Sequence, residues 1–90
     1  MATAILKLKI MPESPEADLA AIEEKTTAEL EKFKAKIHSV EKEPIAFGLV
    51  ALIMTVVWPE ETGTEEAENA AKSVAGVSSV EIIDYRRAFG

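Results

Sequence analysis

The sequence contains no cysteine and a single histidine, His38. Without cysteine the chain forms no disulfide and offers no thiolate to a metal, and one histidine rules out a histidine-clustered metal site. As a general base, His38 has no evident partner, and we expect it on a partly exposed edge strand. We therefore expect no metal and no cofactor.

Phosphate-binding loops are also missing, because neither G-x-x-x-x-G-K-[ST] nor G-x-G-x-x-G occurs in the sequence. Positive charge is scarce: 10 Lys and Arg stand against 16 Asp and Glu, for a net charge of −6. Nucleic-acid backbones bind clustered Lys and Arg, so we expect no direct nucleic-acid binding and a better fit to a basic protein surface. The carboxylate pairs Glu60-Glu61 and Glu65-Glu66 are typical of a solvated helix start rather than of catalytic acids.

No hydrophobic run is long enough to span a membrane. The longest, residues 49–57, is interrupted only by Thr55 and closes on Trp58-Pro59. A run of about ten apolar residues is too short for a membrane span and is typical of a strand buried on both faces. The N-terminal segment carries Lys7 and Lys9 within its apolar stretch, unlike a signal peptide. These features predict a cytoplasmic protein without membrane contact.

The hydrophobic pattern predicts one domain, residues 1–90, with six elements. We expect strands at residues 3–11, 35–42, 49–57 and 77–87, a first helix at 15–33, and a second helix from about residue 62 or 64 to Gly76. This order is typical of a ferredoxin-like α+β fold, with two helices on one face of a four-stranded antiparallel sheet. The first and third strands would lie in the centre, because the third is the most apolar.

Capping residues predict where the two helices begin. Ser14 is the expected N-cap of the first helix, followed by Pro15 in its first turn. Thr62 or Thr64 is expected to cap the second helix, with Glu65 completing a capping box from Thr62.

The third strand has apolar side chains on both of its faces. One set is Val50, Leu52, Met54 and Val56, and the opposite set is Leu49, Ala51, Ile53 and Val57. In a two-layer fold the helices cover a single face, so one set is expected to lack cover. An exposed apolar sheet face of this kind usually marks a contact with a partner or a second copy.

Two segments resemble a known family. Pro44-Ile45-Ala46-Phe47-Gly48-Leu49 resembles the Pro-Ile-x-Phe-Gly-Ile/Leu stretch of the translation elongation factor 1-beta family. Met11-Pro12-Glu13-Ser14-Pro15-Glu16 resembles the strand-to-helix turn of its short archaeal members. The resemblance covers essentially the whole chain, with the elements in the same order.

The resemblance implies a guanine-nucleotide exchange factor, with no bond chemistry of its own, that is monomeric when free. Its partner would be elongation factor 1-alpha, the GTPase that delivers aminoacyl-tRNA to the ribosome. In the family the turn aromatic docks on the GTPase, and the C-terminal end of the domain works near the Mg²⁺ and phosphate site. The resemblance therefore assigns partner binding to Pro44, Ile45, Phe47, Gly48, Tyr85, Arg86 and Arg87. Eukaryotic relatives carry a lysine near the C-terminus, whereas no lysine follows Lys72 here.

The residues alone leave alternatives open. Phe47 could fold back over the sheet edge as a core aromatic, Trp58 could be core rim or a contact residue, and the arginine pair could be a solvated strand end. The alternative function is a self-associating ferredoxin-like regulatory or assembly module. In that case the third strand would form a homodimer through the open sheet face, and Phe47 would lie at the rim of that contact.

Overall fold

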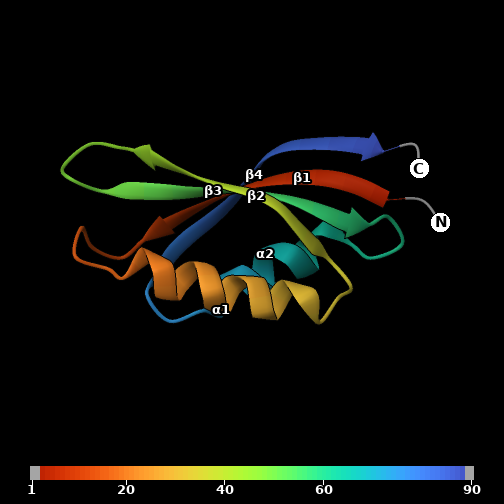
Figure 1. Cartoon of the computed structure of the whole chain (residues 1–90), viewed down its shortest axis with the longest axis horizontal. Helices are drawn as coiled ribbons and strands as arrows, with labels where there is room; N and C mark the ends of the chain where they lie inside the picture. Colours follow the sequence, from red (N-terminus) through yellow and green to blue (C-terminus); the bar gives the residue numbers. More distant parts are fainter. Residues whose placement is uncertain (1–2, 89–90) are drawn as a thin grey trace.

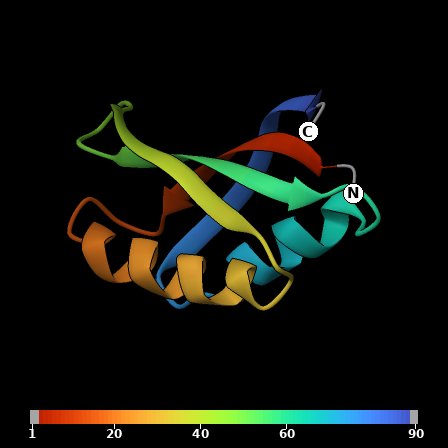
Figure 2. The same ribbon diagram turned by 45° about the vertical axis from the view of Figure 1, so that its right-hand side comes forward.

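The structure is a computed structural model that describes residues 3–88. Its elements are β1 (Thr3–Pro12), α1 (Leu19–Glu31), β2 (Lys36–Pro44), β3 (Val50–Pro59), α2 (Thr64–Lys72) and β4 (Val77–Ala88). The strands form one antiparallel sheet in the order β2-β3-β1-β4, and both helices lie against the same face (Figures 1 and 2). The ferredoxin-like βαββαβ fold and the central position of the first and third strands are thereby confirmed.

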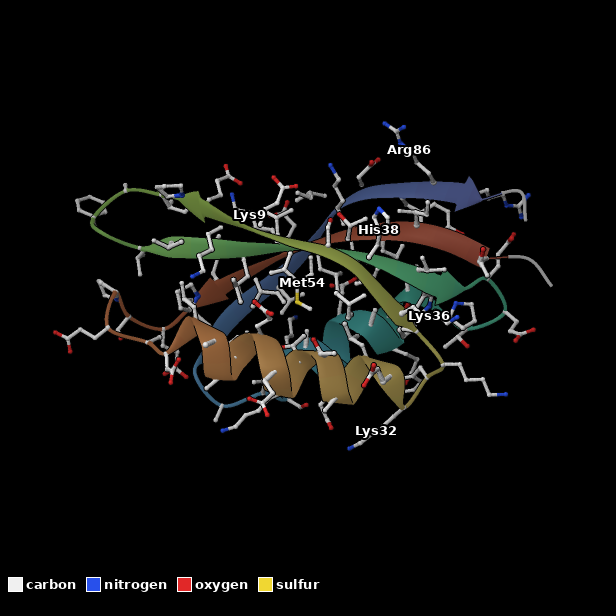
Figure 3. All side chains as sticks on the ribbon, in the orientation of Figure 1. Lys9, Lys32, Lys36, His38, Met54 and Arg86 are labelled. Carbon is white, nitrogen blue, oxygen red and sulfur yellow. The ribbon has the colours of Figure 1, made fainter. Side chains whose placement is uncertain are left out.

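The core lies between the helices and one face of the sheet. Alternation along β1 sends Leu6, Leu8 and Ile10 to this face, where each is at most 1% exposed. Met54 on β3 also points toward the helices, as Figure 3 shows. The helices contribute Ile22, Leu30, Ala67 and Ala71, and the two alanines on α2 bring that helix close to the sheet.

Both helices begin later than the capping residues predict. Ser14 does not cap α1; its carbonyl accepts a hydrogen bond from the amide of Ala17 (3.2 Å), which closes a separate turn. The N-cap is Asp18, whose carboxylate accepts from the amide of Ala21 (3.1 Å), so the helix starts at Leu19 and ends at Glu31. The N-cap of α2 is Gly63 with no side-chain cap, so the capping box from Thr62 is also wrong.

The strand ends differ from the expected ones by one or two residues. Pro44 belongs to β2 rather than to the following turn, which an edge strand tolerates because its outer backbone positions need no ladder hydrogen bond. β3 begins at Val50 and continues to Pro59. No helix among residues 3–88 is both long enough and apolar enough to cross a membrane.

The open face of the sheet, which points away from the helices, is not the bare apolar surface that the sequence suggests. Ala51, Ile53 and Thr55 lie on this face and are 0%, 8% and 8% exposed. In the strand register Lys7 stands beside Thr55, while Lys9 and Glu41 flank Ile53. The aliphatic stems of such side chains can cover apolar neighbours while their charges remain in water. The expectation of an uncovered set was therefore wrong for Ala51 and Ile53, because their cover comes from neighbours that are distant in sequence, whereas Leu49 and Val57 are half-buried.

Candidate partner-binding surfaces

The molecule is elongated, with principal extents of 41 × 20 × 18 Å. The loop between β2 and β3 lies at one end, and the paired residues Thr3 and Ala88 lie at the other (Figure 1). Arg87 pairs with Ala4, which in turn pairs with Trp58, so Arg87 is level with the far end of β3. At about 3.3 Å per residue, the two ends of β3 are on the order of 30 Å apart.

The predicted partner-binding residues therefore form two groups. We call residues 44–48 the hairpin end and residues 85–87 the β4 end. The structure brings Pro44, Ile45, Phe47 and Gly48 together, but it separates them from Tyr85, Arg86 and Arg87. A partner that contacts both groups has to follow the length of the sheet.

The hairpin end is built on a tight turn. The amide of Leu49 donates to the carbonyl of Ala46 (3.2 Å), and the amide of Ile45 donates to the carbonyl of Leu49 (2.7 Å). The two central residues, Phe47 and Gly48, have φ angles of 61° and 77°. Positive φ at both positions is the signature of a type I′ turn, whose twist matches that of the paired strands.

Phe47 is an unusual occupant of the first position in such a turn. Glycine and asparagine are preferred there, because a side chain with positive φ crowds the following carbonyl at a cost of roughly 1–2 kcal/mol. The side chain is 95% exposed, so no packing within the described residues offsets this cost. The core alternative for Phe47 is thus wrong, and the turn holds a large aromatic ring out into solvent.

A second loop supports the turn. A Cβ atom built on Gly48 would lie 3.7 Å from the Cβ of Pro15, which is ordinary contact distance. The turn therefore rests beside the loop that joins β1 to α1, the segment of the second resemblance. Exposed carboxylates of Glu13, Glu16 and Glu43 belong to the segments that form this end.

The β4 end is shaped by a bulge. Leu8 pairs with Ile82 and Lys7 pairs with Asp84, so Ile83 is an extra residue on β4. A bulge of this kind shifts the in–out alternation of the residues that follow it. After it, Tyr85 and Arg87 share the helix face, whereas Asp84 and Arg86 share the open face.

Each arginine has an acidic partner on its own face. On the open face Arg86 Nε lies 3.2 Å from Asp84 Oδ2, and Arg86 points away from the sheet and helices in Figure 3. On the helix face Arg87 Nη2 lies 2.5 Å from Glu60 Oε1. The pair that the sequence presents as one cation cluster is thus divided between two surfaces.

Two residues near the β4 end were not anticipated. Ile83 is 45% exposed and Tyr85 is 46% exposed, and both lie on the edge strand β4. Glu60, interpreted only as part of a solvated acidic run, is the acidic partner of Arg87. The exposure of Ile83 depends on the bulge, and the pairing of Glu60 with Arg87 depends on strand register. Neither feature has a local signal in the sequence.

No other site competes with these two ends within residues 3–88. No group of three or more His, Cys, Asp or Glu side chains in that range is placed to hold a metal ion. A shallow groove of about 290 Å³ lies between α1 and the segment after α2, with no convergent set of polar groups. Its lining residues are Lys25, Ala28, Glu29, Ser73, Val74 and Ala75.

Residues 5–88 match the family model of the EF-1 guanine nucleotide exchange domain. The chain belongs to the elongation factor 1-beta family. The match includes the hairpin end, the neighbouring β1–α1 loop, and β4 as far as Ala88. It therefore covers every residue of the two candidate surfaces.

Archaeal members of the family cover the chain almost end to end. The elongation factor 1-beta of Methanothermobacter thermautotrophicus is 42% identical over 88 residues, which are 97% of this chain and 98% of that protein. That of Methanosarcina acetivorans is 48% identical over 89 residues, covering 97% and 99%. That of Methanocaldococcus jannaschii is 42% identical over 85 residues, covering 93% and 96%.

Proposed function

We propose that this chain promotes the release of GDP from elongation factor 1-alpha and its reloading with GTP during protein synthesis. The observation that carries the proposal is the exposed Phe47, held on a strained turn at the position of the family's docking aromatic. Backbone strain without internal compensation is characteristic of sites that serve a partner. The exchange activity named in the family model supports the same role.

Exchange of this kind needs no bond chemistry from the chain. GDP is held on a GTPase by Mg²⁺ and by a phosphate loop with ordered switch segments. A factor that binds the nucleotide-free GTPase better than the loaded one weakens nucleotide affinity by the same coupling factor. The chain therefore acts by binding, and it stabilises the nucleotide-free conformation of the GTPase.

The two ends would divide this work. Phe47 would enter an apolar pocket of the GTPase, and the surrounding carboxylates would favour a basic rim to that pocket. At the β4 end, Tyr85 and the arginines would lie near the Mg²⁺ and phosphate site. A rigid sheet between the ends would set the separation of the two contacts.

The proposal also includes the location of the chain in the cell, its relation to tRNA and its oligomeric state. A partner in the translation machinery supports a cytoplasmic location. Its net charge of −6 opposes direct binding to tRNA, so its contact with the nucleic acid would run through the GTPase. We propose a single exchange domain that is monomeric when free.

The test is the release of labelled GDP from the elongation factor 1-alpha of the same organism, with excess unlabelled nucleotide. We expect release to accelerate with the concentration of this chain and to saturate. The same assay without the chain gives the intrinsic rate. An unchanged rate at concentrations well above that of the GTPase would contradict the proposal.

The alternative is a homodimer through the open face. The burial of Ala51 and Ile53 within one copy argues against it, and the half-buried Leu49 and Val57 leave a smaller apolar area for such a contact. Sedimentation of the free chain at micromolar concentration decides the point. A stable dimer would favour the alternative, and a monomer would favour exchange.

A further inference from the structure

We propose that Glu60 is a positioning residue for nucleotide exchange, because it holds Arg87 and thereby fixes the direction of the β4 end. The inference rests on the proposed function and adds a residue outside the predicted partner-binding set. It assigns different roles to the two arginines: Glu60 ties Arg87 to the β3–α2 loop, whereas Arg86, whose ion pair with Asp84 lies within β4 itself, is presented to the partner.

Glu60 has a firmly placed backbone. It follows Pro59, which pairs with Thr3 at the end of the sheet. The amide of Thr62 donates to the carbonyl of Pro59 (3.1 Å), so Glu60 sits inside a closed turn. The indole Nε1 of Trp58 then donates to the carbonyl of Thr62 (2.9 Å), which ties the far side of that turn to a core side chain. The Glu60 side chain is only 20% exposed.

Arg87 has to reach across a strand to meet this carboxylate. It lies on β4, whereas Glu60 follows β3, and β1 runs between those two strands. The β1 residue level with Arg87 is Ala4, which is fully buried and whose methyl group leaves room for the arginine stem. The ion pair therefore joins the outer edge strand to the β3–α2 loop over the intervening strand.

This ion pair contributes little to the stability of the fold. The Arg87 side chain is 70% exposed, and ion pairs open to solvent contribute only about 0–1 kcal/mol to stability. β4 is already held by its ladder with β1 along its whole length. The pair instead fixes the orientation of the Arg87 side chain on the edge strand β4.

Strand alternation after the bulge at Ile83 places Arg86 on the open face and Arg87 on the helix face. The ion pair adds a contact outside the ladder near the end of β4, next to Arg86. If this contact is lost, we expect the alignment of the neighbouring Arg86 to become less well defined. Because Arg86 would act on the phosphate site and not as the main anchor, we expect poorer alignment to lower the maximal release rate more than the affinity for the GTPase.

The experiment compares Glu60→Gln with Glu61→Gln in the GDP-release assay. Both variants remove one carboxylate from the same loop, but Glu61 is exposed and has no ion-pair partner among the described residues. For Glu60→Gln we expect the maximal release rate to fall roughly 3- to 10-fold, as for the loss of one positioning ion pair. The half-saturating concentration and the melting temperature should stay near wild type, and Glu61→Gln should match wild type throughout.

Charge exchange separates positioning from direct contact. Glu60→Arg and Arg87→Glu should each slow exchange, and the double variant should recover a large part of the maximal rate because the ion pair is restored. If Arg87 itself touched the GTPase, the double variant would stay as slow as Arg87→Glu.

Two results would overturn the inference while leaving the proposed function intact: wild-type rates in Glu60→Gln, or no recovery in the double variant. Absence of exchange by the wild-type chain would instead overturn the proposed function, and this inference with it.

Discussion

Strand β3 has one aromatic residue just before its start and another near its end, and their environments are opposite. Phe47 is 95% exposed in a turn, whereas Trp58 is 1% exposed and packs beside Phe33, with ring centroids 5.6 Å apart. Trp58 lies on the helix face within the alternation of β3, while Phe47 lies outside any strand, between residues with no ladder partner. Exposure of an aromatic is thus decided by its place in the alternation rather than by its hydrophobicity.

The largest effect is expected for Trp58→Ala. The change leaves a cavity beside Phe33 and removes the indole hydrogen bond to Thr62, at a cost of about 3–5 kcal/mol. A 90-residue domain has little stability to spare, so we expect most of the cooperative melting transition to be lost. Circular dichroism during heating measures this. A well-folded Trp58→Ala protein would remove the contrast between the two aromatics.

Phe47→Ala should have the opposite outcome, with a stable fold and weaker binding to the GTPase. The ring makes no contact that folding needs, so the melting temperature should stay within a few degrees of wild type. An aromatic at the centre of an interface contributes about 2–4 kcal/mol, or roughly 30- to 1,000-fold in affinity for the GTPase. The GDP-release titration measures this loss. Phe47→Leu is the matched control and should keep part of the affinity, since it retains apolar area in the same turn.

Arg86→Ala examines the other end of the molecule. We expect the exchange rate to fall roughly 10-fold, because an interfacial charge is lost, while stability changes by less than about 1 kcal/mol. Lys9→Ala removes a cation from the same face but nearer the hairpin end, and it should exchange normally. Equal losses in both variants would indicate a general charge effect on the open face.

Gly48→Ala tests whether the turn itself matters. An alanine at φ 77° costs about 1–2 kcal/mol, which lowers the melting temperature of a domain of this size by roughly 4–16 °C. We also expect weaker binding to the GTPase, since the direction of Phe47 depends on this turn. Gly63→Ala is the control for a glycine without positive φ: its φ of −61° suits alanine and a Cβ atom there meets nothing within 4 Å, so only the N-cap preference for glycine is lost and binding to the GTPase should stay normal.

The smallest effect is expected for a substitution in helix α1, which lies between the two ends. Thr26 on α1 is fully buried, and its hydroxyl has no hydrogen-bond partner among residues 3–88. Thr26→Val should therefore stabilise the domain by about 1 kcal/mol, visible as a higher urea midpoint, and leave exchange unchanged. Thr27→Val, at the half-buried neighbouring position, should change neither quantity. A change in exchange with Thr26→Val would show that the ends respond to core stability.

The sequence was sufficient to predict the order of elements and the pairing of central strands. Both follow from local periodicity and from the apolar excess of residues 49–57. Helix starts were less predictable, because Ser14 and Asp18 are both good caps and the choice depends on how the β1–α1 loop turns.

The candidate site was only partly predictable. Its residues at the hairpin end came from a motif, and the exposure of Phe47 remained open until the turn geometry was known. The division of Arg86 from Arg87 follows from strand alternation, but the face that each arginine takes depends on the bulge at Ile83, which has no signal in the sequence. The role of Glu60 depends on three strands being side by side, and such long-range placement has no local sequence signal.

The burial of Trp58 also gives the molecule a built-in optical probe. It is the only tryptophan in the chain, so the intrinsic fluorescence of the free protein comes mainly from one ring at a known place. That ring lies in the core and donates to the loop that carries Glu60, roughly 30 Å from the hairpin turn. Its emission therefore reports on unfolding and on the surroundings of the Glu60 loop, while changes confined to Phe47 leave the spectrum as it is.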